Sequence, residues 1–134
     1  MNTSNIIYQG DLRTEATHIR SGQSIITDAP LDNQGKGEVF SPTDLVATAL
    51  GTCMLTVMGI VAQRYGIDMI GTKADVEKVM GKDPRRIVEV KINIEFGNRI
   101  KPDDRVRLER AAHSCPVGNS LHSDLKEMVE FIYT

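Results

Sequence analysis

Residues 41–66, SPTDLVATALGTCMLTVMGIVAQRYG, decide the fold of this chain. Nineteen consecutive residues between Asp44 and Arg64 carry no charge, and thirteen of these nineteen are apolar. Ser41 and Asp44 have the spacing of a helix cap, and Gly66 favours a left-handed helix end. We therefore expect one long helix that is apolar all round, and such a helix has to be buried on every side.

The composition is that of an ordinary globular protein. The chain has 134 residues, of which 40% are apolar and 25% charged, and this predicts one domain over residues 1–134. Eighteen acidic and sixteen basic residues give a net charge of −2, so we expect no nucleic-acid partner and no anionic membrane surface. No basic segment followed by an apolar run opens the sequence, so we expect no secretory signal and a cytoplasmic protein.

The uncharged run is long enough to cross a bilayer. It is rich in threonine, glycine and alanine, however, and it lacks the aromatic and basic flanks of a membrane span. We interpret it as the central helix of a core. Because a domain of this size seldom wraps a helix on all faces, we expect a second subunit to cover one side, which predicts a homodimer.

Strands are predicted before and after the helix. The signal for each is alternation of apolar and polar residues between turn residues. The predicted strands are residues 6–17, 23–29, 69–80, 86–96 and 127–133. The first two form a hairpin with its turn at residues 20–22, and residues 86–96 alternate as in an antiparallel sheet with one wet face. The order of elements predicts an α+β fold with sheet packed on helices.

A second helix is expected to begin at Pro102. Its apolar residues recur at helical spacing and form one face that ends at Cys115. These residues are Leu108, Ala111, Ala112 and Cys115. Pro116 then begins a short helix that runs to about residue 121, so Cys115 points inward at the junction of the two helices.

Cys53 and Cys115 each lie on a core-facing helical surface and suggest a thiol pair. A thiolate that attacks a peroxide becomes a sulfenic acid, which a nearby thiol traps as a disulfide. Free cysteines are equally often small buried apolar residues. The N-cap position of Cys115 lowers a thiol pKa, whereas the apolar surroundings of Cys53 raise one. The residues alone leave open which thiol is the better nucleophile.

A thiolate at Cys53 requires a cation from elsewhere in the fold. Arg13 and Arg20 are the candidates, although such arginines usually occupy solvated strand or turn positions. His113 and His122 flank Cys115, but their spacing is poor for a metal and no carboxylate cluster completes a site. We interpret both as ordinary histidines and expect neither a metal nor a cofactor site.

Three stretches of the chain resemble the osmotically inducible protein C / organic hydroperoxide resistance superfamily. Two of them are SPTDLVATALGTC at 41–53 and CPVGNSLH at 115–122. The third, GDLRTEATH at 10–18, is similar to the amino-terminal hairpin of some smaller members of the superfamily. The likeness runs in order through nearly the whole chain. It implies one OsmC-like domain whose antiparallel sheets wrap long central helices in an intertwined homodimer.

The resemblance also implies a cysteine peroxidase that needs no cofactor. Cys53 matches the peroxidatic position and Cys115 the resolving position. The implied substrates are organic hydroperoxides, and the implied reductant is a dithiol, in some branches of the lipoyl type. An apolar substrate suits an apolar cleft at the subunit interface, and we expect Thr43, Leu50 and Met54 to line this cleft.

One residue departs from the pattern of the peroxidase branches. Those branches read N-P-E before the cysteine helix, and the glutamate holds a catalytic arginine near the thiolate. This chain has Thr43 in the place of that glutamate, and Asp44 substitutes only if the helix start or the arginine shifts. Arg13 is the best match for the arginine and Arg20 the second. The departure places the chain nearer the general group of the family than its dedicated peroxide enzymes.

Two other functions remain open at this point. A non-catalytic protein that binds an apolar metabolite at the dimer interface is favoured by Thr43, whereas the two retained cysteines argue against it. A sulfur or acyl carrier that uses Cys115 is the third alternative.

Overall fold

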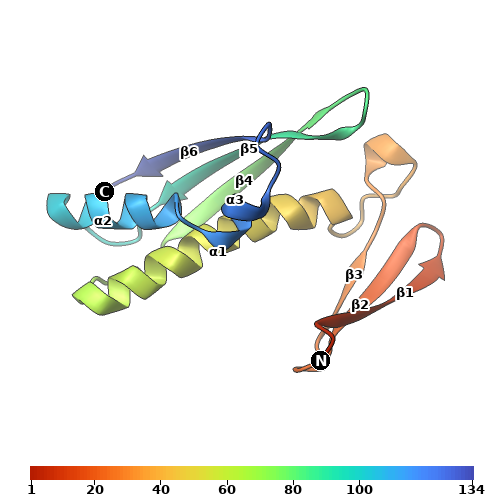
Figure 1. Ribbon diagram of the computed structural model, residues 1–134, viewed down its shortest axis with the longest axis horizontal. Coiled ribbons are helices and arrows are strands. Elements are labelled where there is room, and N and C mark those ends of the chain that lie inside the picture. Colours follow the sequence, from red (N-terminus) through yellow and green to blue (C-terminus); the bar gives the residue numbers. More distant parts are fainter. The chain divides into compact units, whose positions relative to one another are not determined.

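The computed structural model describes all 134 residues, which form an amino-terminal unit of residues 1–45 and a carboxy-terminal unit of residues 46–134 (Figure 1). The amino-terminal unit contains a three-stranded antiparallel sheet in the order β1-β2-β3. Its elements are β1 (Ser4–Gly10), β2 (Arg13–His18), β3 (Ser24–Thr27) and a 3₁₀ turn at Leu31–Asn33.

The predicted first strand, residues 6–17, is wrong because the chain reverses in the middle of it. Asp11 and Leu12 have φ values of 54° and 63°, and they form the turn between β1 and β2. A two-residue hairpin turn of type I′ requires positive φ at both central positions, which aspartate tolerates and leucine rarely adopts. Because Leu12 fits the alternation of apolar and polar residues, the sequence pattern gives no sign of a turn at this position. The second turn, before β3, is confirmed.

Helix α1 (Pro42–Tyr65) confirms the long central helix. Its start is a reciprocal cap: the amide of Asp44 donates to Ser41 Oγ at 3.1 Å, and the amide of Ser41 donates to Asp44 Oδ2 at 3.0 Å. These bonds satisfy two backbone donors that a helix start otherwise leaves unpaired. At the other end Gly66 has a φ of 66°, as expected of a left-handed stop.

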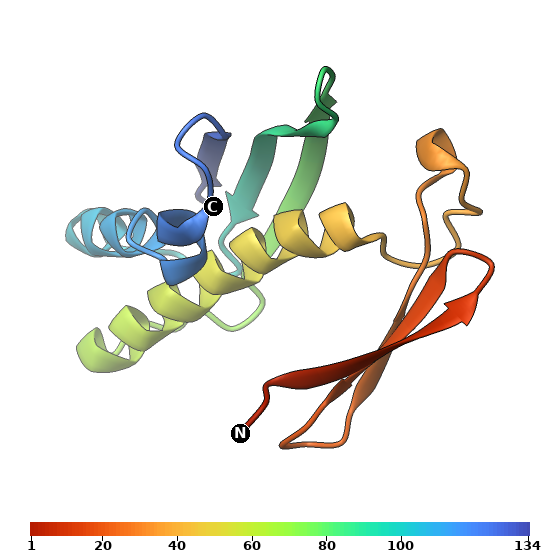
Figure 2. The same ribbon diagram turned by 45° about the vertical axis from the view of Figure 1, so that its right-hand side comes forward.

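Each element predicted after α1 is present, with small shifts at its bounds. They are β4 (Lys73–Gly81), β5 (Arg86–Glu95), α2 (Pro102–Ala112), α3 (Pro116–Ser120) and β6 (Lys126–Ile132). The strands form a sheet in the order β4-β5-β6, and the helices lie along it (Figures 1 and 2). The α+β fold class is confirmed.

The second sheet differs from expectation in one pairing. Strands β4 and β5 are antiparallel, whereas β5 and β6 are parallel, with Ile92 opposite Val129. Because α2 and α3 lie between β5 and β6, they return the chain to the end of the sheet where β5 began. A crossover of this length is what parallel neighbours need.

One face of the second sheet packs on the helices and forms the core. From Val90 onward β5 alternates as predicted, with Val90, Ile92 and Ile94 buried and Lys91, Asn93 and Glu95 exposed. The fully buried side chains include Leu50, Met54 and Met58 of α1, Val90, Ile92 and Ile94 of β5, and Leu108 of α2. We call this the inner face of the sheet.

The other side of α1 is uncovered within the single chain, and it is for such a side that the sequence predicts a second subunit. Val46 is 37% exposed and Ile60 53% exposed, and Thr52 and Thr56 lie between them on the exposed side. By length and composition alone α1 is also apolar enough to cross a membrane, and a third of its most apolar part is buried in the chain. Its buried side belongs to the core of the carboxy-terminal unit.

Candidate active site

The carboxy-terminal unit brings the two cysteines together. Cys53 lies on α1 and is half-buried, whereas Cys115 lies between α2 and α3 and is only 1% exposed. Both are free thiols, and they lie close enough for Cys53 to contribute to the raised pKa of Cys115. We call Cys53 and Cys115 the thiol pair.

Local structure fixes the position of Cys115. Helix α2 ends at Ala112, and Pro116 occupies the first position of α3, where its missing N–H costs nothing. Cys115 is the N-cap residue between them, as predicted, and its Sγ accepts the amide N–H of Gly118 at 3.3 Å. A β-like backbone at Cys115 turns the side chain into the core.

Burial raises the pKa of the Cys115 thiol above its ordinary value. The amide of Gly118 acts in the opposite direction, whereas the neighbouring Cys53 and the negative charge of Glu127 add to the rise. The expectation that an N-cap position lowers this pKa is therefore right about the amide and wrong about the net direction. Cys115 is a protonated thiol at neutral pH.

Glu127 is a residue of this site that the sequence reasoning missed. A Cβ placed at Gly118 would lie 3.2 Å from Cys115 Sγ and 3.3 and 3.4 Å from the two carboxylate oxygens of Glu127. The sulfur and the carboxylate thus lie beside the same glycine, and the Glu127 side chain is exposed to solvent. The alternation along the predicted strand could have identified it, because Glu127 lies on the same face of β6 as Val129 and Phe131.

Arg13 and Arg20 both belong to the amino-terminal unit. Arg13 Nη2 lies 2.6 Å from Glu38 Oε2 and 3.4 Å from Asp28 Oδ2, whereas Arg20 is exposed in the turn before β3. Asp28 is 1% exposed, and burial acts to raise its pKa, but the Glu38 amide and Arg13 outweigh burial and hold that pKa below its usual range. A role for either arginine at Cys53 stays a prediction.

The other predicted site residues divide between the two units. In the amino-terminal unit, the Asp44 carboxylate caps α1, and Thr43 Oγ1 lies 3.3 Å from Ser41 Oγ. In the carboxy-terminal unit, Leu50 and Met54 are fully buried core residues. Their expected contacts with a substrate, and a catalytic role of Asp44, stay predictions.

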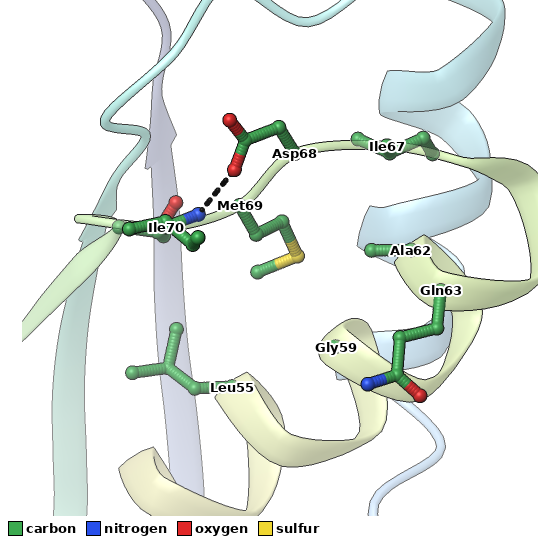
Figure 3. Close-up of a pocket in the computed structure, with 9 residues that line it drawn as sticks. Leu55, Gly59, Ala62, Gln63, Ile67, Asp68, Met69 and Ile70 are labelled. Carbon is green, nitrogen blue, oxygen red and sulfur yellow. Dashed lines mark hydrogen bonds between the residues drawn. The ribbon is translucent and has the colours of Figure 1, made fainter.

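A cavity of about 440 Å³ opens beside the carboxyl-terminal half of α1. Leu55, Gly59 and Gln63 of α1 line one wall, and residues 67–70 line the other. Leu55 and Met69 point into it, and Asp68 Oδ1 accepts the amide N–H of Ile70 at 2.9 Å (Figure 3). Neither cysteine lines this cavity, although Leu55 is two residues from Cys53.

The histidines near Cys115 are surface residues. His113 lies edge-on to the Phe131 ring at a centroid distance of 5.9 Å, and His122 Nδ1 accepts the amide N–H of Asp124 at 3.0 Å. Both are exposed. No three histidine, cysteine, aspartate or glutamate side chains gather as a metal site.

Solved structures of the same fold cover almost the whole chain. A Psychrobacter arcticus protein, provisionally assigned to the osmotic stress and detoxification response, is 52% identical over 98% of this chain and 96% of its own, with a TM-score of 0.95. An organic hydroperoxide resistance protein OsmC from Legionella pneumophila is 15% identical over 98% of each chain, with a TM-score of 0.77. The organic hydroperoxide resistance protein OhrB of Bacillus subtilis is 18% identical over 97% of this chain and 98% of its own, with a TM-score of 0.70.

No curated protein matches the sequence of this chain. The model of the OsmC-like protein family matches residues 35–127, a range that includes α1, both members of the thiol pair and Glu127. This match extends over most of the chain. Two of the stretches that carry the resemblance, residues 41–53 and 115–122, lie within it, and the third, residues 10–18, lies outside it. The chain therefore belongs to the OsmC-like protein family.

Proposed function

We propose that this protein is a thiol-dependent peroxidase that reduces organic hydroperoxides. The observation that carries the proposal is the proximity of two free thiols from separate elements, α1 and the α2–α3 junction: Cys53 packs against the buried cluster that contains Cys115 and contributes to the raised pKa of that thiol. Neighbours of the same fold that are named organic hydroperoxide resistance proteins support the substrate class.

The chemistry needs three balanced steps. The Cys53 thiolate attacks one oxygen of the hydroperoxide and the O–O bond breaks, so that Cys53 becomes a sulfenic acid. The alkoxide that leaves takes a proton from water and departs as the alcohol. Cys115 then attacks the oxidised sulfur, the S–O bond breaks, and water leaves as the disulfide forms. A dithiol of the lipoyl type reduces the disulfide by exchange and is itself oxidised to a disulfide.

The surroundings of the two sulfurs support this division of roles. Cys53 is half-buried and therefore accessible to a peroxide, whereas Cys115 is almost fully buried and its pKa is raised by burial. A buried neutral thiol is a poor first nucleophile and a suitable trap for a neighbouring sulfenic acid. A reducing, cytoplasmic location belongs to the proposal, because the resting state has two free thiols.

The test is mass spectrometry of the protein after one equivalent of cumene hydroperoxide. Wild-type protein is expected to form a Cys53–Cys115 disulfide, and Cys115→Ser to stop at a sulfenic acid on Cys53. Cys53→Ser is expected to consume peroxide no faster than buffer. Absence of the disulfide in wild-type protein, with both thiols still titratable, would contradict the proposal.

We further propose that the functional form is a homodimer in which a second copy covers the exposed side of α1. Val46 and Ile60 lie more than a third exposed on a helix whose other side is core. Leaving such a stripe in water forgoes hydrophobic free energy, about 25 cal/mol for each Å² of apolar surface. A symmetric partner offers the same stripe in return.

The cavity beside α1 favours a second candidate, a binding protein for an apolar small molecule. Its volume of about 440 Å³ lies within the range of ligand sites, and its walls are mostly aliphatic. Native mass spectrometry of freshly purified protein separates the two functions. A ligand that co-purifies equally with wild-type and Cys53→Ala protein, together with absence of peroxide consumption, would favour binding.

The carrier function is disfavoured because Cys115 is too buried to exchange a cargo.

A further inference from the structure

The outer wall of the cavity beside α1 is held by contacts that lie outside the cavity. This wall is formed by residues 67–70. Asn98 Nδ2 donates to the carbonyl oxygen of Ile70 at 3.1 Å, and a Cβ at Gly97 would lie only 2.7 Å from that oxygen. At the other end of the wall, the amide of Ile67 donates to a carbonyl of the last turn of α1 at 2.8 Å. Because both ends of the wall are fixed, the cavity is preformed, as most ligand sites are.

The α1 wall of the cavity contains a glycine that the packing of the single chain does not require. A Cβ at Gly59 would meet nothing within 4 Å, whereas a Cβ at Gly51 would lie 2.8 Å from Val76. Glycine inside a helix is less favourable than alanine, so its presence calls for a reason. At Gly59 the reason is not a neighbour within the chain, and the effect of the glycine is to enlarge the cavity.

The lining of the cavity selects the kind of molecule that fits. Leu55 and Met69 point into it, and the amide of Gln63 makes no hydrogen bond to the other residues drawn (Figure 3). Asp68 is the one charged residue of the lining, and its Oδ1 already accepts the amide N–H of Ile70. An anion would face this carboxylate, and any charge would lose hydration among the apolar walls. A neutral molecule with an aliphatic body and one hydrogen-bonding group suits this lining.

The mouth of the cavity adjoins the exposed side of α1. Gln63 lines the cavity and follows Thr56 of the exposed side by seven residues, so the two lie on one face of the helix. On the opposite wall Ile70 is 85% exposed. A molecule in the cavity of a single chain would keep one side in water, whereas ligand sites bury most of the ligand surface. The volume of about 440 Å³ also exceeds what any one side chain of a partner could fill.

We propose that this cavity binds a neutral, mainly aliphatic molecule whose hydrogen-bonding group meets Gln63, and that a second copy of the chain closes the site. Binding and dimer formation are then linked, because a ligand that binds the dimer more tightly favours the dimer by the same factor. The inference deepens the binding function proposed above, and its closing step rests on the proposed homodimer. It does not depend on thiol chemistry, since neither cysteine lines the cavity.

The experiment uses the full chain and the neutral fluorescent probe N-phenyl-1-naphthylamine. The probe is expected to bind saturably, with one molecule for each chain, and decanol is expected to displace it. Decanoate has the same number of carbons and a negative charge, and it is expected to compete about tenfold more weakly, because its charge loses hydration near Asp68. Decanol is also expected to keep the protein dimeric, as measured by light scattering, at a dilution where protein without decanol dissociates.

Two variants test the placement of the site. Gly59→Leu puts a side chain into the cavity and is expected to weaken decanol binding about tenfold or more. Val106→Leu is the control, because it adds apolar bulk at an exposed position of α2 that does not line the cavity. If Gly59→Leu does not fold, Gln63→Leu serves instead, since this exposed residue carries the proposed hydrogen bond and its loss is expected to weaken decanol binding several-fold.

Absence of saturable probe binding in dimeric wild-type protein overturns the inference, and so does decanol binding that neither Gly59→Leu nor Gln63→Leu weakens. Equal affinity of monomer and dimer for decanol, or a wild type that is monomeric at every concentration, overturns the closing role of the second copy. A protein that binds decanol and consumes no peroxide refutes the proposed peroxidase and leaves this inference standing, so the two failures are distinguishable.

Discussion

Tyr133 concentrates several interactions at the carboxyl end of the core. Its hydroxyl donates to Glu109 Oε2, and its ring stacks on the Phe96 ring at a centroid distance of 4.8 Å. The Cζ atom of Arg105 lies 4.2 Å from the centroid of the Tyr133 ring. Burial raises the pKa of Tyr133, and the bond to Glu109 adds to the rise. The phenol thus stays protonated in the folded protein at a pH where an unfolded chain already loses the proton.

We expect Tyr133→Phe to lower the free energy of unfolding by about 1 kcal/mol at pH 8, because a hydrogen bond to a carboxylate is lost while the stacking remains. Since the folded pKa is raised, the contribution of the hydroxyl is complete below about pH 10 and disappears as the pH rises further. Urea unfolding at several pH values measures this. The wild-type advantage should shrink above pH 10, and Tyr65→Phe, at an exposed position on α1, is the control.

The residues of the site were predictable to different degrees. Cys53 and Cys115 followed from helical periodicity and their sequence contexts, and the structure brings them together. The net direction of the Cys115 pKa was not predictable, because a local amide and burial oppose each other and only the fold sets the extent of burial. Glu127 was missed because an acid at the start of a short strand reads as a solvated end.

At the scale of elements, two glycines of α1 test how closely the helix packs on the sheet. A Cβ at Gly51 would lie 2.8 Å from Cγ2 of Val76 on β4, and valine has little freedom to turn away. A Cβ at Gly59 meets nothing within 4 Å, because that turn opens on the cavity. The same substitution should therefore have opposite effects eight residues apart.

We expect Gly51→Ala to lower the free energy of unfolding by about 1–2 kcal/mol, since overpacking outweighs the gain in helix propensity. Gly59→Ala should raise it by up to about 1 kcal/mol, because only the propensity gain remains. Chemical denaturation of both variants measures the difference. A loss of stability at Gly59 as well would indicate that another surface packs against that turn.

Most elements were predictable because their signals are local. The cap at Ser41 and Asp44, the stop at Gly66 and the alternation along β5 each specify structure within a few residues. Two features escaped for physical reasons. Leu12 adopts a positive φ that leucine rarely takes, and the parallel pairing of β6 depends on where α2 and α3 return the chain, which no local pattern encodes.

At the scale of the molecule, the exposed side of α1 is the feature that the single chain does not account for. The sequence predicts a helix that needs cover on every side, and the core supplies cover on one side only. Ile60 lies on this exposed side, in the carboxyl-terminal half of α1, and is 53% exposed. A second copy of the chain is the cover we propose.

Ile60→Lys should therefore weaken the dimer by placing a charge in an apolar contact, where an unpaired charge costs several kcal/mol. Val106→Lys is the matched control, because Val106 is 58% exposed and lies on α2 and not on α1. Light scattering after size exclusion is expected to give a dimer for wild type and Val106→Lys and a monomer for Ile60→Lys at low micromolar concentration. Mass action adds a second readout, since the unfolding midpoint of a dimer rises with protein concentration. A monomeric wild type whose midpoint is independent of concentration would leave α1 uncovered in solution and contradict the homodimer.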